Sequence, residues 1–199
     1  MKKQVLIIHG GTTFENKAEY YKYLENQTID IERIVPGYDW KMTIQDDLGE
    51  DYAVLCPKMP NSTYAIYQEW KMWFENLLKI LDEELILVGH SLGGIFLAKY
   101  LSEHLIDNKI SKLILVAAPF TETADEPLAS FKLGKSLKKL DEQISSIFII
   151  HSKDDPVVPF SDSLHYAENL KNAEHIAFKD KKHFNSEKFT DLAKIIKQP

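Results

Sequence analysis

The feature that most constrains the fold is a series of short apolar runs that recur along the whole chain. Six of them are expected to be strands: Gln4–Ile8, Tyr52–Cys56, Leu85–Val88, Lys112–Ala117, Ile147–Ile150 and Glu174–Phe178. Most are apolar throughout instead of alternating with polar residues, which is typical of parallel strands that helices cover on both faces. Helical patterns lie between the runs, at Glu15–Asn26, Tyr64–Leu81, Leu92–Leu105, Ser161–Lys171 and Ser186–Lys197. The alternation predicts an α/β fold with a mostly parallel sheet of about six strands and helices on both faces.

Residues 1–199 are expected to form a single domain, because the chain contains no internal repeat and no linker long enough to divide it. Its 199 residues, 44% of them hydrophobic, suffice for one sizeable core. Two segments depart from the simple alternation. An insertion at about residues 12–51 follows the first strand and includes a turn at Pro36-Gly37, and a small cap-like segment at about residues 118–144 follows the fourth strand. Both leave the carboxyl edge of the predicted sheet, where open α/β folds bind their ligands.

Charge and composition argue against several kinds of partner. The formal net charge is −6 and the isoelectric point is near 5.7, whereas a surface that binds nucleic acid is basic. No run of the sequence approaches the roughly 20 apolar residues of a membrane span. The single cysteine, Cys56, excludes an intrachain disulfide and a zinc site built on paired cysteines, and we expect it to be buried at a strand end. These features predict a cytoplasmic protein that binds neither nucleic acid nor a membrane.

The segment GHSLG, which places Ser91 between two glycines, is the main candidate for chemistry. A strand is predicted directly before it and a helix directly after it, which is the setting of a nucleophile elbow. Gly89 and Gly93 remove side chains that would collide where the strand and the helix pack closely. Such a turn raises the Ser91 side chain above the sheet and directs the backbone N–H of Leu92 at the same place. The alternative is a tight structural turn with an incidental serine.

A serine nucleophile needs a base, and the base needs an acid that orients it. In this kind of fold the two follow the serine in the order acid, then histidine. His183 is the preferred base, because it lies in the predicted loop after the last strand, at the carboxyl edge of the sheet. His165 is expected within a helix, and His175 at the opposite end of the last strand.

The acid has two neighbouring candidates, Asp154 and Asp155, in the exit loop of the fifth predicted strand. Either could reach His183, and local physics does not choose between them. An acid elsewhere in the chain, such as Asp125 after the fourth strand, is a further alternative.

At this loop the chain resembles the α/β-hydrolase superfamily, whose acid loop commonly reads His-Gly-x-x-Asp-x-x-Val-Pro. Matched residue by residue to the segment HSKDDPVVP, the resemblance places Ser152 on the glycine and implies Asp155 as the acid. It extends to the segment HGGT after the first strand, because a His-Gly segment at that place supplies an oxyanion-hole donor in the superfamily. The resemblance therefore implies an oxyanion hole that joins the N–H of Leu92 to that of Gly11 or Thr12.

Within the superfamily the chain resembles the small serine hydrolases of the retinoblastoma-binding protein nine and YdeN-like type. The shared features are its shortness, the segment Pro57–Asn61 after the second strand, and Trp70 on the following helix. Because the opening strand already carries the His-Gly segment, the resemblance implies an α/β-hydrolase fold that lacks the first strands of full-length members. The sequence HGGT and the insertion at 12–51 depart from this branch.

These features predict a carboxylesterase-like serine hydrolase that cleaves a small ester or another acyl substrate and uses neither a metal ion nor a cofactor. It would act through a Ser-His-Asp triad of Ser91, His183 and Asp155, with an acyl-enzyme intermediate. The residues expected to line an apolar substrate pocket are Phe14, Met59, Phe120, Phe160 and Phe184. Two alternatives stay open: a non-catalytic or weakly catalytic binding protein on the same scaffold, and an acyltransferase with the same triad.

Overall fold

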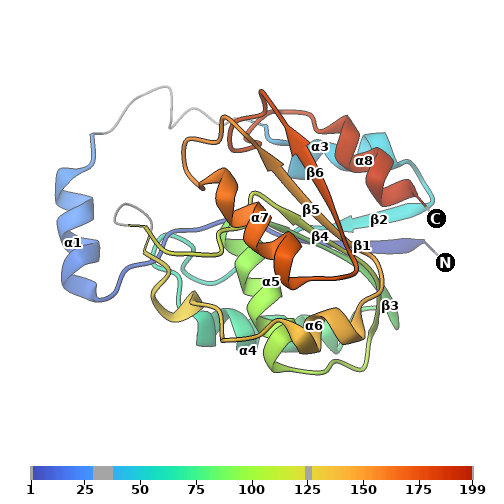
Figure 1. Ribbon diagram of the computed structural model, residues 1–199, viewed down its shortest axis with the longest axis horizontal. Coiled ribbons are helices and arrows are strands. Elements are labelled where there is room, and N and C mark those ends of the chain that lie inside the picture. Colours follow the sequence, from blue (N-terminus) through green and yellow to red (C-terminus); the bar gives the residue numbers. More distant parts are fainter. Residues whose placement is uncertain (1, 29–37, 124–126, 199) are drawn as a thin grey trace.

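The computed structural model describes residues 2–28, 38–123 and 127–198, and a six-stranded sheet forms its centre (Figure 1). The strands are β1 (Lys3–Ile8), β2 (Tyr52–Leu55), β3 (Glu84–His90), β4 (Lys109–Val116), β5 (Ile147–Ser152) and β6 (Ala173–Phe178). Neighbouring strands are parallel, and their order across the sheet is β2-β1-β3-β4-β5-β6. The predicted α/β class is confirmed, and each predicted strand overlaps an observed one.

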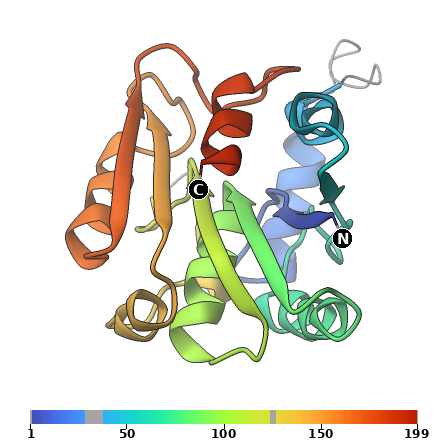
Figure 2. The ribbon, with the colours of Figure 1, turned by 90° about the vertical axis from the view of Figure 1, so that its right-hand side faces the viewer.

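Helices cover both faces of this sheet. The helices of the described residues are α1 (Lys17–Asn26), which lies apart from the sheet, α3 (Trp40–Leu48), α4 (Tyr67–Leu78), α5 (Leu92–Glu103), α6 (Lys138–Gln143), α7 (Phe160–Asn169) and α8 (Thr190–Lys197), with a 3₁₀ turn, η1 (Ala129–Phe131). Figure 2 shows α3 and α8 on one face, and α4, α5 and α6 on the other. Within the described ranges, no helix combines the length and the apolar character that a membrane span requires.

The apolar character of the strands follows from this double cover, as β1 illustrates. Val5 and Ile7 belong to the core beneath α3 and α8, whereas Leu6 and Ile8 belong to the core beneath α4 and α5. Successive side chains of a strand point to opposite faces, so both sets must be apolar. All four side chains are at most 1% exposed. A strand of this kind cannot show alternation, which is why the sequence reads as continuous apolar runs.

In its described part, the insertion after β1 contains two helices with different surroundings. Asn16 caps α1 by accepting a hydrogen bond from the backbone N–H of Glu19, and none of the helix's residues is buried. Figure 1 shows α1 at one end of the molecule, away from the sheet. In contrast, α3 packs on the sheet through Trp40 and Ile44. The predicted turn at Pro36-Gly37 lies outside the described residues.

In the segment predicted to be cap-like, the described residues 127–144 lie along the helical face that contains α5. Both η1 and α6 contact α5, and Phe131 and Leu140 are buried there. At the carboxyl edge, the Thr13 hydroxyl donates a hydrogen bond to the carbonyl of Pro127. This bond joins the insertion after β1 to the segment after β4.

Candidate active site

Ser91 occupies a strained turn between β3 and α5. Its φ of 54° and ψ of −124° are unusual for a residue with a side chain, and its N–H donates to the carbonyl of Val116 over 2.9 Å. A Cβ on Gly93 would lie 2.1 Å from the carbonyl oxygen of Ile8, and one on Gly89 would lie 2.6 Å from that of Gly93. Only glycine fits at both positions, so the turn has the local requirements of a nucleophile elbow.

His183 is hydrogen-bonded to Asp155 at the carboxyl edge of the sheet. Its Nδ1 lies 2.9 Å from Oδ2 and 3.1 Å from Oδ1 of the carboxylate. The Asp155 side chain is fully buried, and its Oδ1 also accepts the backbone N–H groups of Val157 and Val158. Because a carboxylate only accepts hydrogen bonds, Nδ1 of the neutral His183 ring must carry the proton. The lone pair is then on Nε2, as a general base requires.

Ser91 and His183 line the same cavity, which has a volume of about 850 Å³. Among the described residues, no hydrogen bond joins Ser91 Oγ to the His183 ring. In serine hydrolases such bonds often tighten only when substrate is bound. The cavity therefore brings the predicted nucleophile and base together, with the acid directly behind the base.

Asp154, the alternative acid, has a different set of contacts. Its Oδ1 accepts the hydroxyl of Ser152 over 2.5 Å and the backbone N–H of Lys182 over 2.9 Å. These two hydrogen bonds, the first of which is the main cause, lower the pKa of Asp154. Asp154 thus joins the acid loop to the loop that carries His183, but it is Asp155 that contacts the imidazole. Asp125 lies outside the described residues.

The other two histidines considered as bases are away from Ser91. His165 is half-buried on α7, with its Nδ1 3.7 Å from a carboxylate oxygen of Glu168. His175 lies on β6, where its Nε2 contacts the hydroxyl of Ser163 over 3.0 Å. Neither lines the cavity that contains Ser91.

The prediction that Thr12 can serve as an oxyanion-hole donor is wrong. The N–H of Thr12 donates to the carbonyl of Ser62 over 2.8 Å, so it is not free to bind a substrate oxygen. Leu92 is the first residue of α5, and its N–H therefore has no acceptor within the helix. The N–H of Gly11 has no acceptor within the part of the chain that the structure describes. Leu92 and Gly11 remain as candidate donors, and Gly11 lines the cavity.

His90, which sequence reasoning did not assign, contributes to the same site. It is buried, and its Nε2 lies 2.9 Å from the carbonyl oxygen of His183. Burial holds its pKa well below the usual range, and the nearby cation of Lys41 lowers it further. A neutral His90 donates from Nε2 and fixes the backbone of His183. Its position next to Ser91 in the sequence was the available signal.

The apolar pocket expected from five large side chains is contradicted, because none of them lines the cavity at Ser91. Phe184 is 2% exposed and packs on Phe178 and Phe189, and Met59 belongs to the core on the other face. The other three pack on neighbouring rings: Phe14 on Tyr20 and Tyr64, Phe120 on Tyr166, and Phe160 on His151 and His175. The four phenylalanines therefore pack on neighbouring aromatic rings instead of lining the cavity.

The charged part of the cavity lining consists of Asp39, Lys41 and Lys58, and the apolar side chains that line it are Met42 and Val157. Cys56 also lines it and is exposed, so the expected burial of this thiol is wrong. The reason is that β2 ends at Leu55 and forms the edge of the sheet. Desolvation still raises the pKa of Cys56, while the Lys41 cation opposes the rise.

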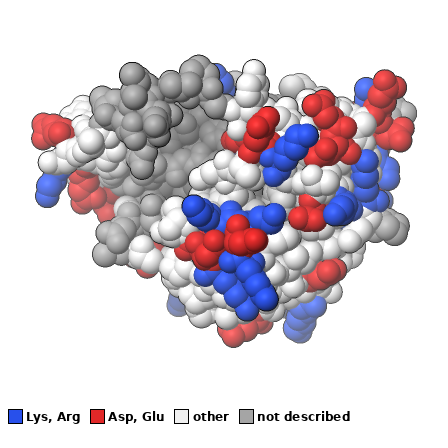
Figure 3. All heavy atoms as spheres, turned by 90° about the horizontal axis from the view of Figure 1, so that it is seen from above, with Lys and Arg blue, Asp and Glu red and all other residues white. Residues whose placement is uncertain are grey.

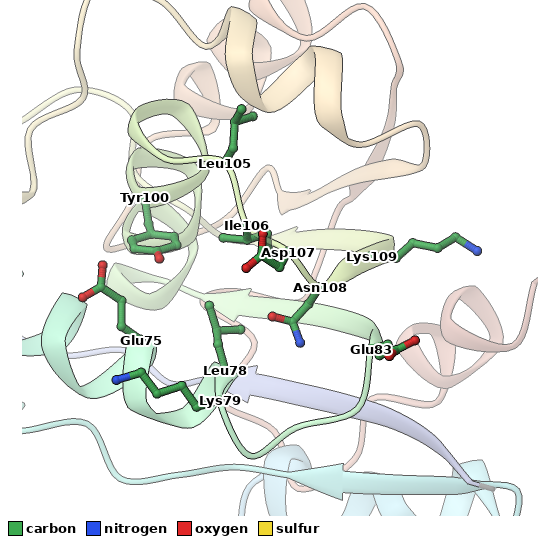
Figure 4. A pocket seen from close by; sticks show the side chains of 10 residues that line it. All are labelled: Glu75, Leu78, Lys79, Glu83, Tyr100, Leu105, Ile106, Asp107, Asn108 and Lys109. Carbon is green, nitrogen blue, oxygen red and sulfur yellow. The ribbon is translucent and has the colours of Figure 1, made fainter.

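Two other cavities lie at the opposite edge of the sheet and lack the groups for acyl transfer. One, of about 550 Å³, lies between the ends of α4 and α5 (Figure 4). Its Tyr100 has a pKa that burial and the neighbouring Glu75 carboxylate raise to about 12. The second, of about 1000 Å³, includes Ser111 and Lys112. Neither cavity has a histidine in its lining, and no group of three His, Cys, Asp or Glu side chains in the described ranges is placed to hold a metal ion.

Comparison with known proteins finds a matching family model and several similar proteins. The family model described as serine hydrolase matches residues 33–197, a range that contains Ser91, Asp155 and His183. The chain is 28% identical over 177 residues to serine hydrolase RBBP9 of Rattus norvegicus, which corresponds to 82% of this chain and 92% of the rat protein. It is 26% identical over 176 residues to YdeN of Bacillus subtilis (strain 168), or 85% of this chain and 80% of that protein. The crystal structure of the ydeN gene product matches with a TM-score of 0.71 at 21% identity, over 98% of this chain and 97% of the other.

Proposed function

The chain belongs to the serine hydrolase family, as a small α/β-hydrolase of the RBBP9 and YdeN branch, and from that premise we propose that it cleaves a small ester or another acyl compound. Ser91 is the proposed nucleophile, His183 the base and Asp155 the acid that orients the base. The substrate is a small molecule, and the activity is that of a carboxylesterase.

The proposed reaction starts when Nε2 of His183 takes the proton of Ser91 Oγ as the oxygen attacks the carbonyl carbon. The oxyanion that forms is bound by the N–H groups of Leu92 and Gly11, and losing one such donor costs about 2.7–4 kcal/mol of transition-state stabilisation. The imidazolium is stabilised by Asp155 and returns its proton to the leaving group. Water then attacks the acyl-enzyme with the same base, releasing the acid and restoring Ser91.

The observation that carries this proposal is that His183, which is hydrogen-bonded to the buried Asp155, lines the same cavity as Ser91. A glycine-bracketed serine with φ of 54° is costly to maintain. A buried aspartate aligned with a histidine at that cavity adds two polar groups that a structural turn does not need. Strain and buried polar groups of this kind cluster where they serve catalysis.

Turnover of p-nitrophenyl acetate and butyrate tests the proposal. Wild-type protein should release p-nitrophenol with saturation kinetics, and Ser91→Ala should reduce the rate to that of the uncatalysed reaction. Ser161→Ala, which changes an exposed serine on α7, is the matched control and should behave as wild type. Equal rates in wild type and Ser91→Ala would contradict hydrolysis at this site and favour a binding protein.

A further inference from the structure

The charges around the cavity at Ser91 are not balanced. Lys41 is paired with Asp39, with 2.7 Å between Nζ and Oδ2, and its side chain is only 9% exposed. Its Nζ also lies 4.8 Å from the centre of the Trp40 ring. Lys58 has no ion pair and no side-chain hydrogen bond among the described residues. With neutral histidines, the described lining therefore carries one uncompensated positive charge.

The excess of positive charge in the cavity lining contrasts with the charge of the whole chain. The chain has a formal net charge of −6, and on the face that carries α3 and α8 lysine and acidic side chains are intermingled (Figure 3). The carboxylate of the proposed triad, Asp155, is fully buried behind His183 and does not line the cavity. An unpaired cation in the lining is thus a local property of the cavity.

The backbone that carries Lys58 is fixed to the loop beside Ser91. The N–H of the next residue, Met59, donates to Nε2 of His9 over 2.9 Å. A Cβ on Gly10, the residue after His9, would lie 3.2 Å from Cβ of Ser91, so this loop and the serine are in close contact. The Lys58 side chain is exposed and keeps its rotamer freedom, but its attachment point is held at the site.

We propose that the substrate bears a carboxylate or another anionic group close to its scissile acyl bond, and that Lys58 binds this group while Ser91 attacks. This inference rests on the proposed hydrolase function and narrows its substrate class. The Lys41–Asp39 pair keeps the adjoining wall of the cavity neutral, so Lys58 is the residue that selects for charge. Attraction between unit charges 4 Å apart in water changes an equilibrium about fivefold.

The test uses two pairs of esters that differ in charge but hardly in size. Phenyl hydrogen adipate and the corresponding primary amide, phenyl adipamate, place the charge on the acyl side. The compounds 4-acetoxybenzoate and 4-acetoxybenzamide place it on the leaving group. For each pair the quantity measured is the ratio of kcat/KM for the anionic ester to kcat/KM for the neutral one. Intrinsic reactivity cancels when this ratio is compared between variants.

Lys58→Gln should lower the ratio about fivefold for at least one pair, and Lys58→Glu should lower it further. The matched control is Lys135→Gln, which removes an exposed lysine outside the cavity and should leave both ratios unchanged. Unchanged ratios in both Lys58 variants, or an equal fall in Lys135→Gln, would overturn the inference.

The two proposals fail in different ways. If p-nitrophenyl acetate is cleaved but neither anionic ester is, the anionic substrate class is wrong and the hydrolase function stands. If no ester is cleaved by the wild type, the proposed function fails and this inference fails with it.

Discussion

Nε2 of His90 lies 2.9 Å from the carbonyl oxygen of His183, so the residue before the proposed nucleophile holds the backbone of the proposed base. The indole Nε1 of Trp40 donates to the next carbonyl, that of Phe184, over 2.8 Å. The residues on either side of His183 both have a left-handed backbone, with φ of 48° at Lys182 and 53° at Phe184. A loop with this strain needs such donors to keep one conformation.

Replacing His90 by leucine should therefore reduce kcat about ten- to a hundredfold, because the imidazole of His183 loses a support and its alignment with Ser91 loosens. KM should change little, since His90 is a positioning residue. His90→Gln keeps a side-chain N–H donor and should recover part of kcat. Steady-state kinetics on p-nitrophenyl acetate measures kcat and KM for the wild type and both variants. Equal kcat in the leucine and glutamine variants would show that the hydrogen bond is not what positions the base.

Stability should fall as the pH is lowered through about 6.5, the usual pKa of histidine. Burial lowers the pKa of both His90 and His151, so the unfolded chain takes up protons there that the folded chain does not. The free energy of unfolding then falls by up to about 1.4 kcal/mol per pH unit for each group, and these groups contribute no slope above their unfolded pKa. Urea denaturation at pH 7.5, 6.5 and 5.5 measures this slope. His90→Gln should be less sensitive to pH, and an identical slope would refute the assignment.

Gly93→Ala should destabilise the protein by about 3 kcal/mol or more, because the new methyl group would meet backbone oxygen atoms that cannot move aside. Its Cβ would lie 2.1 Å from the oxygen of Ile8 and 2.6 Å from that of His9. Gly134→Ala is the matched control, since nothing lies within 4 Å of its Cβ position. Thermal denaturation of the two variants compares them. Similar melting temperatures would mean that the helix does not pack against β1 as closely as described.

Asp155→Asn should reduce kcat/KM by about 10⁴-fold, as expected when the acid that sets the tautomer of a catalytic histidine is lost. Asp154→Asn should cost less than about threefold, because an amide oxygen still accepts from Ser152 and Lys182. Circular dichroism verifies that both variants are folded. If the larger loss occurs in Asp154→Asn, the roles of the two aspartates are reversed.

The strands and the turn at Ser91 were predictable because their requirements are local. A short apolar run such as Ile147–Ile150 favours a strand covered on both faces, and the glycines at 89 and 93 indicate a close approach of strand and helix. The local sequence does not decide whether Asp155 or Asp154 is the acid. Both belong to one loop, and only the folded position of His183 decides which carboxylate meets it.

The positions and contacts of side chains and backbone groups at the carboxyl edge of the sheet were the least predictable from the sequence. Phe184 follows His183 directly, yet its positive φ turns the ring into the core, where Phe178 and Phe189 receive it. The resemblance implied that the N–H of Thr12 could bind an oxyanion, but this N–H donates to the carbonyl of Ser62, 50 residues away in the sequence. Such outcomes depend on partners that are distant in the chain, which sequence patterns do not report.

The most direct test of the central claim is the reaction of the purified protein with a fluorophosphonate probe, followed by mass spectrometry of its peptides. We expect rapid, saturable formation of one adduct at Ser91, none in Ser91→Ala, and slow labelling in His183→Ala, because the hydroxyl is activated by the imidazole. No adduct at Ser91, or an adduct on another residue that forms as fast in Ser91→Ala, would contradict the claim that this serine is the nucleophile.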